Sequence, residues 1–312
     1  MKHKSGRIII TALPLLLFTI IYSCGGKEEA ATTDVADSIA RADSMALKVG
    51  VLPTLDCLPL YVAEKEGIFD SIGVDVRLKQ YEGSLDSDND LMQGTIDGGV
   101  TDCIRAAWMK KKGCDAKAVS LTNGYWQLIT NGKARITKLS QMRDKMIAMT
   151  RFSATAMMAS MAVDSSKIAE EYIFLIQINN PNTRLRMIQN NEMDAALLPE
   201  PQATTARQAK HPVLMDSREK DLQLGCIVFS EKAFADSTKK HQVELFLRAY
   251  DTAVEEINKH GIRAYRDIIN SRMHRDDNAI DALKDTKFSL SAEPSDSIMD
   301  VAKAWIDEQR KK

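Results

Sequence analysis

Acceptor-bearing side chains follow two buried strands in the first third of the chain, where they could bind a small solute. Lys48–Phe69 reads as a strand, a short polar turn and a helix, with Thr54, Asp56 and Cys57 in the turn. Asp102 follows a second predicted strand, which begins at a glycine pair. In open α/β sheets ligands bind at the carboxyl ends of the strands, so these two turns predict two walls of one pocket. Asp102 is equally suited to cap the next helix without touching a ligand.

Two later turns add aromatic and hydroxyl groups. Tyr125 and Trp126 follow an Asn-Gly turn, and their rings could stack on a planar ligand, although core packing is the commoner role of such rings. Ser153 and Thr155 begin an Ala- and Met-rich helix, whose free backbone N–H groups can hold a polar ligand atom. These groups extend the predicted pocket with a stacking face and hydrogen-bond donors.

Two strands farther along the chain each end in a polar residue. Asn180 follows one predicted strand, and Glu200 follows the phrase MDAALLP. A Glu at a strand end can accept hydrogen bonds from an amine or ring N–H, or it can face only a helix N-terminus, where its charge is favoured. The predicted ligand-binding residues are Thr54, Asp56, Cys57, Asp102, Tyr125, Trp126, Ser153, Thr155, Asn180 and Glu200.

The sequence contains no pattern that predicts catalysis or a metal site. It has no Ser-His-Asp arrangement, no P-loop, no GxGxxG motif after a strand and no HExxH motif. No CxxC pair or His/Cys cluster has the spacing of zinc ligands. We therefore predict a binding protein with no catalytic residues, no cofactor and no metal.

The first 46 residues predict export and anchoring. Basic residues precede an apolar run at positions 8–21, which is too short for a comfortable membrane span, and a small residue stands directly before Cys24. This order is typical of a bacterial lipoprotein: residues 1–23 form a signal peptide, Cys24 becomes lipidated, and residues 24–46 form a flexible tether. A plain signal peptide or membrane anchor is the alternative.

Four further cysteines follow this segment. Cys57 and Cys103 each come shortly after a predicted parallel strand, and disulfides are allowed outside the cytoplasm, so a bridge between them is one alternative. The favoured interpretation is that these two, Cys114 and Cys226 are small buried thiols.

Composition indicates a folded body of two moderate domains. The chain is 44% hydrophobic and 27% charged, as in ordinary globular proteins. Residues 1–23 hold three of the 42 basic residues and none of the 43 acidic ones, so without them the formal net charge is −4. That charge argues against a nucleic acid as partner. The remaining length suits two domains.

Three phrases resemble the solute-binding proteins of ATP-binding cassette importers, in the class that takes thiamine precursors, alkanesulfonates or nitrate. PLYVAEKEGIF followed by GVDVRL is similar to that family's opening, and MDAALLPEP is similar to its strand ending in Glu-Pro. KMIAMTRFS is similar to the phrase before the second lobe's first helix, except that Phe152 stands where the family has Gly. The matching residues of the opening are Pro59, Tyr61, Ala63, Gly67, Phe69, Gly73 and Val76.

The resemblance implies an α/β fold of two lobes, the type II periplasmic binding protein fold. Lobe I would comprise residues 47–135 and 223–312, and lobe II residues 136–222, with hinge crossings near 131–139 and 221–228. A monomer, lipid-anchored on the periplasmic side of the bacterial cell envelope, would deliver a small-molecule solute to the importer's permease and ATPase. Two alternatives stay open: an enzyme on the same fold, as in pyrimidine or menaquinone biosynthesis, and a sensor lipoprotein without transport.

The candidate residues also predict the solute's polarity. They include three carboxylates and no Lys or Arg. Like charges ~4 Å apart cost roughly 4 kcal/mol even at an effective dielectric of 20, which disfavours an anion. We expect a planar solute with N–H donors, such as an aminopyrimidine-like thiamine precursor. An anionic solute would require Arg105 or Arg151 to point into the cleft.

Overall fold

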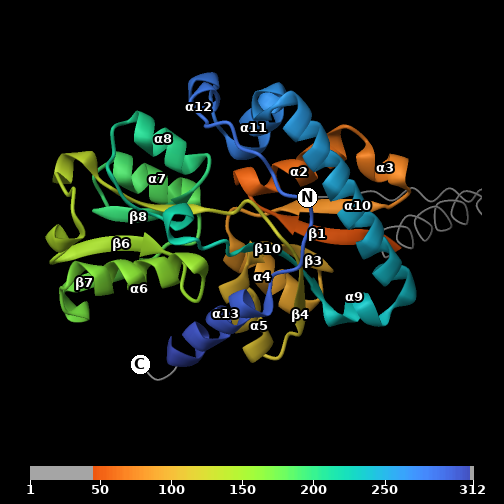
Figure 1. The fold of residues 1–312 in the computed structure, drawn as a ribbon, viewed down its shortest axis with the longest axis horizontal. Helices are drawn as coiled ribbons and strands as arrows, with labels where there is room; N and C mark the ends of the chain where they lie inside the picture. Colours follow the sequence, from red (N-terminus) through yellow and green to blue (C-terminus); the bar gives the residue numbers. More distant parts are fainter. Residues whose placement is uncertain (1–44, 310–312) are drawn as a thin grey trace, which may run out of the picture. The chain divides into compact units, whose positions relative to one another are not determined.

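The computed structural model describes residues 45–309 of the 312-residue chain. The predicted signal peptide, the lipidation site Cys24 and nearly all of the predicted tether lie outside the described residues. Within residues 45–309, two five-stranded sheets lie side by side, each flanked by helices on both faces (Figure 1). No helix in this part of the chain is long and apolar enough to cross a membrane.

The first sheet has the strand order β2-β1-β3-β10-β4. β1 pairs in parallel with β2 and β3, whereas β10 runs antiparallel to both β3 and β4. Gly98 allows the close approach of β10, because a Cβ at this position would lie 2.4 Å from the Phe229 ring. The strands are β1 (Leu47–Val51), β2 (Val76–Gln80), β3 (Gly98–Asp102), β4 (Ala116–Leu121) and β10 (Gly225–Ser230).

Helices cover both faces of this sheet and define lobe I. One face is buried against α2 and α10, through side chains such as Leu58 and Phe246. The other is buried against α5, on which α13 packs, through Ile104 and Ile306. The helices are α2 (Leu58–Lys65), α3 (Ile68–Ile72), α4 (Ser84–Gln93), α5 (Cys103–Lys111), α9 (Glu231–Ala235), α10 (Ser237–His260), α11 (Arg266–Met273), α12 (Asp277–Asp281) and α13 (Asp296–Gln309).

The second sheet, with strand order β7-β6-β8-β5-β9, defines lobe II. Its two cores lie on opposite faces: Ile147 and Met158 pack on the α6 side, and Leu185 and Ala203 on the side of α7 and α8. The elements are β5 (Trp126–Thr130), β6 (Lys145–Met149), α6 (Ala154–Ser166), β7 (Ile173–Gln177), α7 (Pro181–Gln189), β8 (Ala195–Pro199), α8 (Gln202–Gln208) and β9 (Val213–Asp216).

The chain passes between the two sheets at residues 122–125 and 221–224. The second passage agrees with the predicted crossing, but the first lies earlier than the predicted 131–139. The reason is β5, which the sequence places in lobe I and which instead pairs with β8 and β9 of lobe II. A short Asn-Gly turn separates β4 from β5, as in a hairpin, yet β5 lies between β8 and β9 in the second sheet, where all its residues after Trp126 are buried.

Candidate functional site

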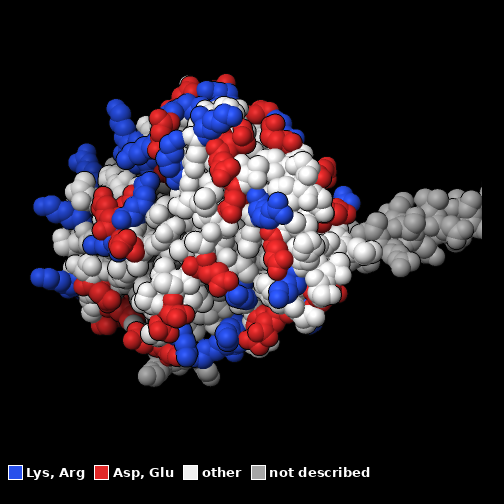
Figure 2. Space-filling view, turned by 45° about the vertical axis from the view of Figure 1, so that its right-hand side comes forward, with Lys and Arg blue, Asp and Glu red and all other residues white. Residues whose placement is uncertain are grey.

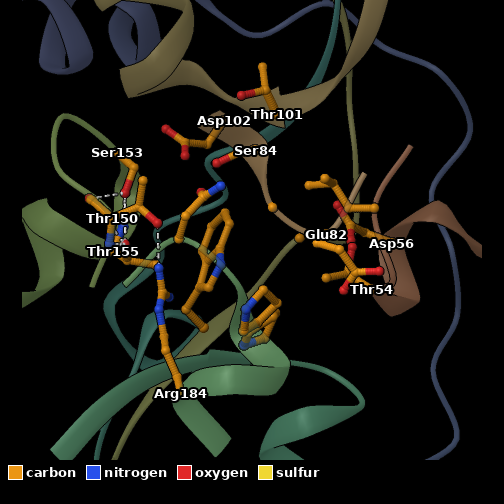
Figure 3. Close-up of a pocket in the computed structure, with 17 residues that line it drawn as sticks. Thr54, Asp56, Glu82, Ser84, Thr101, Asp102, Thr150, Ser153, Thr155 and Arg184 are labelled. Atoms are coloured by element: carbon orange, nitrogen blue, oxygen red, sulfur yellow. Dashed lines mark hydrogen bonds between the residues drawn. The ribbon is translucent and has the colours of Figure 1, made fainter. Parts of the chain in front are cut away.

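A cavity of about 60 Å³ lies between the two lobes, at the carboxyl ends of their parallel strands. Figure 3 shows Thr150, Ser153 and Thr155 on one side of it and Asp56 and its neighbours on the other. The predicted site residues that line the cavity are Thr54, Asp56, Asp102, Trp126, Ser153 and Thr155. The sequence-based prediction therefore found residues from both walls.

Asp56 belongs to the lobe I wall. It lies in a single 3-10 turn (Leu55–Cys57) between β1 and α2, and the side chain is 8% exposed. Its Oδ2 accepts a hydrogen bond from the Thr122 hydroxyl at 3.1 Å. Burial raises the pKa of Asp56, while hydrogen bonds from Thr54 and Thr122 act in the opposite direction. The Asp56 carboxyl group is therefore a buried hydrogen-bond acceptor whose position beside the cavity is fixed by Thr122.

Asp102 connects the two lobes as well as lining the cavity. Its Oδ1 accepts the backbone N–H of Arg105 at 2.9 Å, which caps α5, and the backbone N–H of Ala154 in lobe II at 3.0 Å. Burial raises the pKa of Asp102 to about 7, although these backbone hydrogen bonds favour the ionised form. Asp102 is thus a helix cap that also faces the cavity.

Hydroxyl groups form the lobe II wall. Ser153 is the N-cap of α6, and its Oγ accepts the backbone N–H of Thr155 at 3.1 Å and of Ala156 at 3.4 Å. The same Oγ donates to the carbonyl of Thr150 at 2.6 Å, and the Thr155 hydroxyl accepts the Thr150 N–H at 2.9 Å. This network fixes the start of α6 at the edge of the cavity.

Arg184 also lines the cavity, and sequence reasoning missed it. The side chain projects from α7, is 3% exposed, and donates to the carbonyls of Ile178 at 2.7 Å and Leu197 at 2.8 Å and to the Thr150 hydroxyl. Burial lowers the pKa of Arg184 to about 9, so the guanidinium stays charged at neutral pH. The available signal was helical spacing, because Arg184 shares the buried face of α7 with Ile188.

Only one of the two predicted aromatic residues, which are neighbours at the first passage between the lobes, lines the cavity. Trp126 is half-buried, lines the cavity, and donates its backbone N–H to the Ser217 hydroxyl at 3.0 Å. Tyr125 does not line the cavity; the Arg218 guanidinium lies 5.9 Å from the centre of its ring. Trp126 is therefore the aromatic face available to a solute.

Three other predicted residues do not line the cavity. Cys57 is fully buried in the lobe I core, where its Sγ accepts the N–H of Leu52. Asn180 is the N-cap of α7, and its amide donates to Glu82 of lobe I at 3.0 Å. Glu200 accepts the backbone N–H of Thr204 at 2.9 Å, which matches the helix-N-terminus alternative.

The arginines expected to point into the cleft for an anionic solute do not line the cavity either. Arg105 is 1% exposed, forms a buried ion pair with Asp88, and donates to the carbonyl of Arg151 at 3.2 Å. Those two positions therefore add no cation to the cavity. The argument that the pocket contains no Arg was nevertheless wrong, because Arg184 supplies one.

The cysteines after the anchor segment are all free thiols. Cys57 packs on one face of the first sheet, while Cys103 lies on the other face in hydrogen-bond contact with Cys226. The suggested Cys57–Cys103 disulfide is therefore absent, because the sheet separates the two sulfur atoms. Among the described residues, no group of three His, Cys, Asp or Glu side chains could hold a metal ion.

Bonds across the cleft hold the two lobes together around the cavity. The Leu55 N–H donates to the Glu200 carbonyl at 2.8 Å, and the Gln202 amide to the Pro53 carbonyl at 3.0 Å. On the α5 side, Trp108 stacks on Phe152 with ring centroids 5.9 Å apart.

Phe152 has a backbone φ of 53°, a left-handed conformation that suits Gly. Its ring nevertheless contacts Trp108 of the opposite lobe.

Comparison with known proteins agrees with this architecture. A similar structure is the ligand-binding component of an ABC-type import system from Staphylococcus aureus with zinc bound (16% identity, TM-score 0.70, covering 86% of this chain and 92% of that one). Another is the alkanesulfonate-binding protein SsuA from Xanthomonas axonopodis pv. citri bound to MOPS (14%, 0.71, 85% and 92%). A third is the periplasmic nitrate-binding protein NrtA from Synechocystis (15%, 0.66, 82% and 74%).

These structures confirm the predicted two-lobed periplasmic binding protein fold. A search of curated protein sequences found no match. The sequence profile described as NMT1/THI5 like matches residues 54–264, about two thirds of the chain. The chain therefore belongs to the NMT1/THI5-like family.

Proposed function

We propose that the protein is an extracytoplasmic solute-binding lipoprotein that closes two lobes on a small solute and delivers it to the permease and ATPase of an ABC importer. The cavity between the lobes is the observation that carries this proposal, because groups from both lobes line it and hydrogen bonds cross its edges. The similar structures include the ligand-binding component of an ABC-type import system.

The lobe I wall favours a solute with hydrogen-bond donors. Asp56 and Asp102 are buried acceptors, and Trp126 of lobe II offers a flat face to the same cavity, so an aminopyrimidine-like thiamine precursor suits this arrangement. A cavity of about 60 Å³ is smaller than the ~150 Å³ that holds a benzene ring. A pyrimidine ring would therefore keep the lobes somewhat farther apart than they are here.

A small anion is the second candidate, and Arg184 is the observation that favours it. This buried guanidinium lines the cavity, and its hydrogen-bond partners among the described residues are the neutral oxygens of Ile178, Leu197 and Thr150. The similar structures include proteins named for alkanesulfonate and nitrate. Against a simple anion, Asp56 and Asp102 would lie close to it in a partly dry cavity.

A thermal-shift panel tests the proposal. A ligand at ~100 times its dissociation constant stabilises the fold by about 2.7 kcal/mol, which moves a melting curve measurably. We expect aminopyrimidines to raise the melting temperature and simple alkanesulfonates and nitrate to leave it unchanged. Stabilisation by the anions alone would replace the first candidate with the second. Absence of stabilisation by any solute, with no solute retained by protein from its own host, would contradict solute binding itself.

The anchor and the partners have separate tests. Incorporation of a labelled lipid precursor should require Cys24, and equal labelling of a Cys24→Ser variant would refute lipidation.

Neighbouring genes for a permease and an ATPase would separate a transport protein from a sensor lipoprotein. A nucleic-acid partner is not expected, since basic and acidic side chains of the described residues are interspersed on the face shown in Figure 2.

A further inference from the structure

We propose that the solute is polarised: N–H donors at one end bind Asp56 and Asp102 of lobe I, and an anionic oxygen-bearing group at the other end binds Arg184 of lobe II. This inference rests on the proposed function and narrows its solute class. It also explains why carboxyl groups and a guanidinium line the same cavity.

Arg184 has unused hydrogen-bonding capacity. A guanidinium has five N–H donors. The Arg184 side chain uses one each for the carbonyls of Ile178 and Leu197 and for the Thr150 hydroxyl. Two N–H donors of a group that lines the cavity therefore remain, enough for a carboxylate in the usual two-pronged geometry.

The charge of Arg184 is also uncompensated within the described part of the chain. Two arginines there are almost fully buried, Arg105 at 1% exposure and Arg184 at 3%. Arg105 has its own counter-ion, because it pairs with Asp88. Arg184 bonds to neutral acceptors, and its pKa is lowered by burial with no opposing contribution from a carboxylate. An anionic group on the solute would supply the missing partner of Arg184.

The two charges come from opposite walls. Arg184 projects from α7 of lobe II, whereas Asp56 and Asp102 stand on lobe I, and Figure 3 shows Arg184 on the side of the cavity away from Asp102. A solute with donors at one end and an anionic group at the other can bind both walls only when the lobes are close together. Charge complementarity would then select the solute and favour closure together.

A purely structural role of Arg184 is the competing explanation. Its three bonds join the segments that follow β6 and β7 to β8, so the side chain could simply clamp these strand ends. The test must therefore measure which solute group Arg184 recognises, and stability alone would not decide.

Two matched pairs of probes measure how much an anionic group on the solute contributes to affinity. 2-Aminopyrimidine is compared with 2-aminopyrimidine-5-carboxylate, and 3-aminopropanol with 3-aminopropanoate, by calorimetry on the wild-type protein and on Arg184→Gln. Arg186→Gln is the control, because Arg186 lies on the same helix but is exposed, so its loss removes the same charge outside the cavity.

We expect the wild type and Arg186→Gln to bind at least one carboxylate-bearing probe ~10-fold or more tightly than its neutral partner, as for a charge-assisted hydrogen-bonded pair. Arg184→Gln should lose this preference and retain its affinity for the neutral partner. The inference is overturned if the wild type shows no preference in either pair, or if Arg184→Gln keeps it. If Arg184→Gln does not fold, the comparison of charged and neutral probes on the wild-type protein still tests the inference. Binding of neutral probes alone overturns this inference but leaves the proposed function standing.

Discussion

The two lobes contribute chemically different walls to one cavity. Hydroxyl groups line the cavity on both sides, but the buried carboxyl groups, Asp56 and Asp102, come from lobe I, whereas the charged Arg184 comes from lobe II. Each wall taken alone would bind many solutes weakly, because acceptors select only for donors and a cation selects only for anions. In the proposed function, closure would bring both walls to the same solute, and the difference between the lobes would then be a source of specificity.

The walls also differ in how they are held. Asp102 of lobe I accepts the Arg105 N–H of its own lobe and, across the cleft, the Ala154 N–H, so one of its two backbone hydrogen bonds depends on closure. Arg184 bonds within lobe II, through Ile178, Leu197 and Thr150. The lobe II wall is therefore preformed in an isolated lobe, whereas part of the lobe I wall is completed by the opposite lobe.

Among the changes that test the difference between the two walls, removal of the Asp102 carboxyl group should weaken solute binding most. Asp102→Ala removes the cap of α5, worth about 0.5–2 kcal/mol, together with the bond to Ala154 and an acceptor in the cavity. We expect lower stability in urea and roughly 100-fold weaker solute binding, from ~3 kcal/mol of lost charge-assisted bonding. Asp102→Asn keeps an acceptor oxygen and should recover stability but not affinity. Equal affinity of Asp102→Asn and wild type would show that the charge has no role.

A methyl group at Gly83 should obstruct closure without disturbing either lobe. Its backbone is extended, so Ala is tolerated there, but the added Cβ would lie 2.6 Å from the Asn179 side chain of lobe II. Asn179 must then move, losing its bonds to the Leu85 N–H at 3.2 Å and to Asp86 at 3.1 Å. Two such bonds correspond to ~10-fold weaker solute binding, with little change in the melting temperature of the unliganded protein.

A double-mutant cycle checks this explanation of the Gly83 effect. Asn179→Ala alone should weaken binding by a similar factor, and Gly83→Ala combined with Asn179→Ala should be no weaker than Asn179→Ala. Additive losses would show that the methyl group acts on something other than Asn179.

The raised pKa of Asp102, a lobe I residue, predicts that the stability of the protein depends on pH. Its folded-state pKa of about 7 lies above the unfolded value of 3.8, so between these values the native state holds a proton that the unfolded chain has released. Stability of the unliganded protein should therefore fall as pH rises from about 4 to 7, and burial of Asp56 and Asp88 acts in the same direction. Urea denaturation across this range should show a smaller slope for Asp102→Asn. An unchanged slope would mean that Asp102 is ionised throughout.

The smallest effect is expected at the rim of the cavity. Glu82 is exposed, and its carboxylate accepts a hydrogen bond from the Asn180 amide across the cleft. Glu82→Gln keeps an acceptor oxygen and should change solute affinity by less than about threefold, as for other exposed polar contacts. A loss of affinity comparable to that of Asp102→Ala would show that Glu82 at the rim matters for binding as much as the buried Asp102.

The fold was predictable because its local signals and its long-range arrangement agree. The apolar runs of β1, β3 and β8 are fully or almost fully buried, and the helices α5, α6 and α7 each begin at a residue suited to capping. The first crossing was misplaced because nothing local distinguishes β5 as a partner of β4 from β5 as a partner of β8. Sheet membership is decided by tertiary pairing, which the alternation of residues within one strand does not report.

Cavity-lining residues were predictable where they stand directly at strand ends, as Asp102 and Ser153 do. Arg184 was missed because it lies inside α7, after the cap, and enters the cavity through its long side chain. Glu200 stands at a strand end but its carboxylate bonds to Thr204 and Arg207 of its own lobe. Position in a turn shows which residues are near the cleft, whereas the partners of each polar group decide which of them remain free to bind.

A crystal structure of the protein purified from its own host, with the solute it retains, tests the central claim most directly. We predict one solute between the lobes, with its N–H donors within hydrogen-bonding distance of Asp56 or Asp102 and an anionic oxygen within that distance of Arg184. A solute bound through one lobe alone, or one whose anionic group lies beside the carboxyl groups and away from Arg184, would contradict the account of two complementary walls.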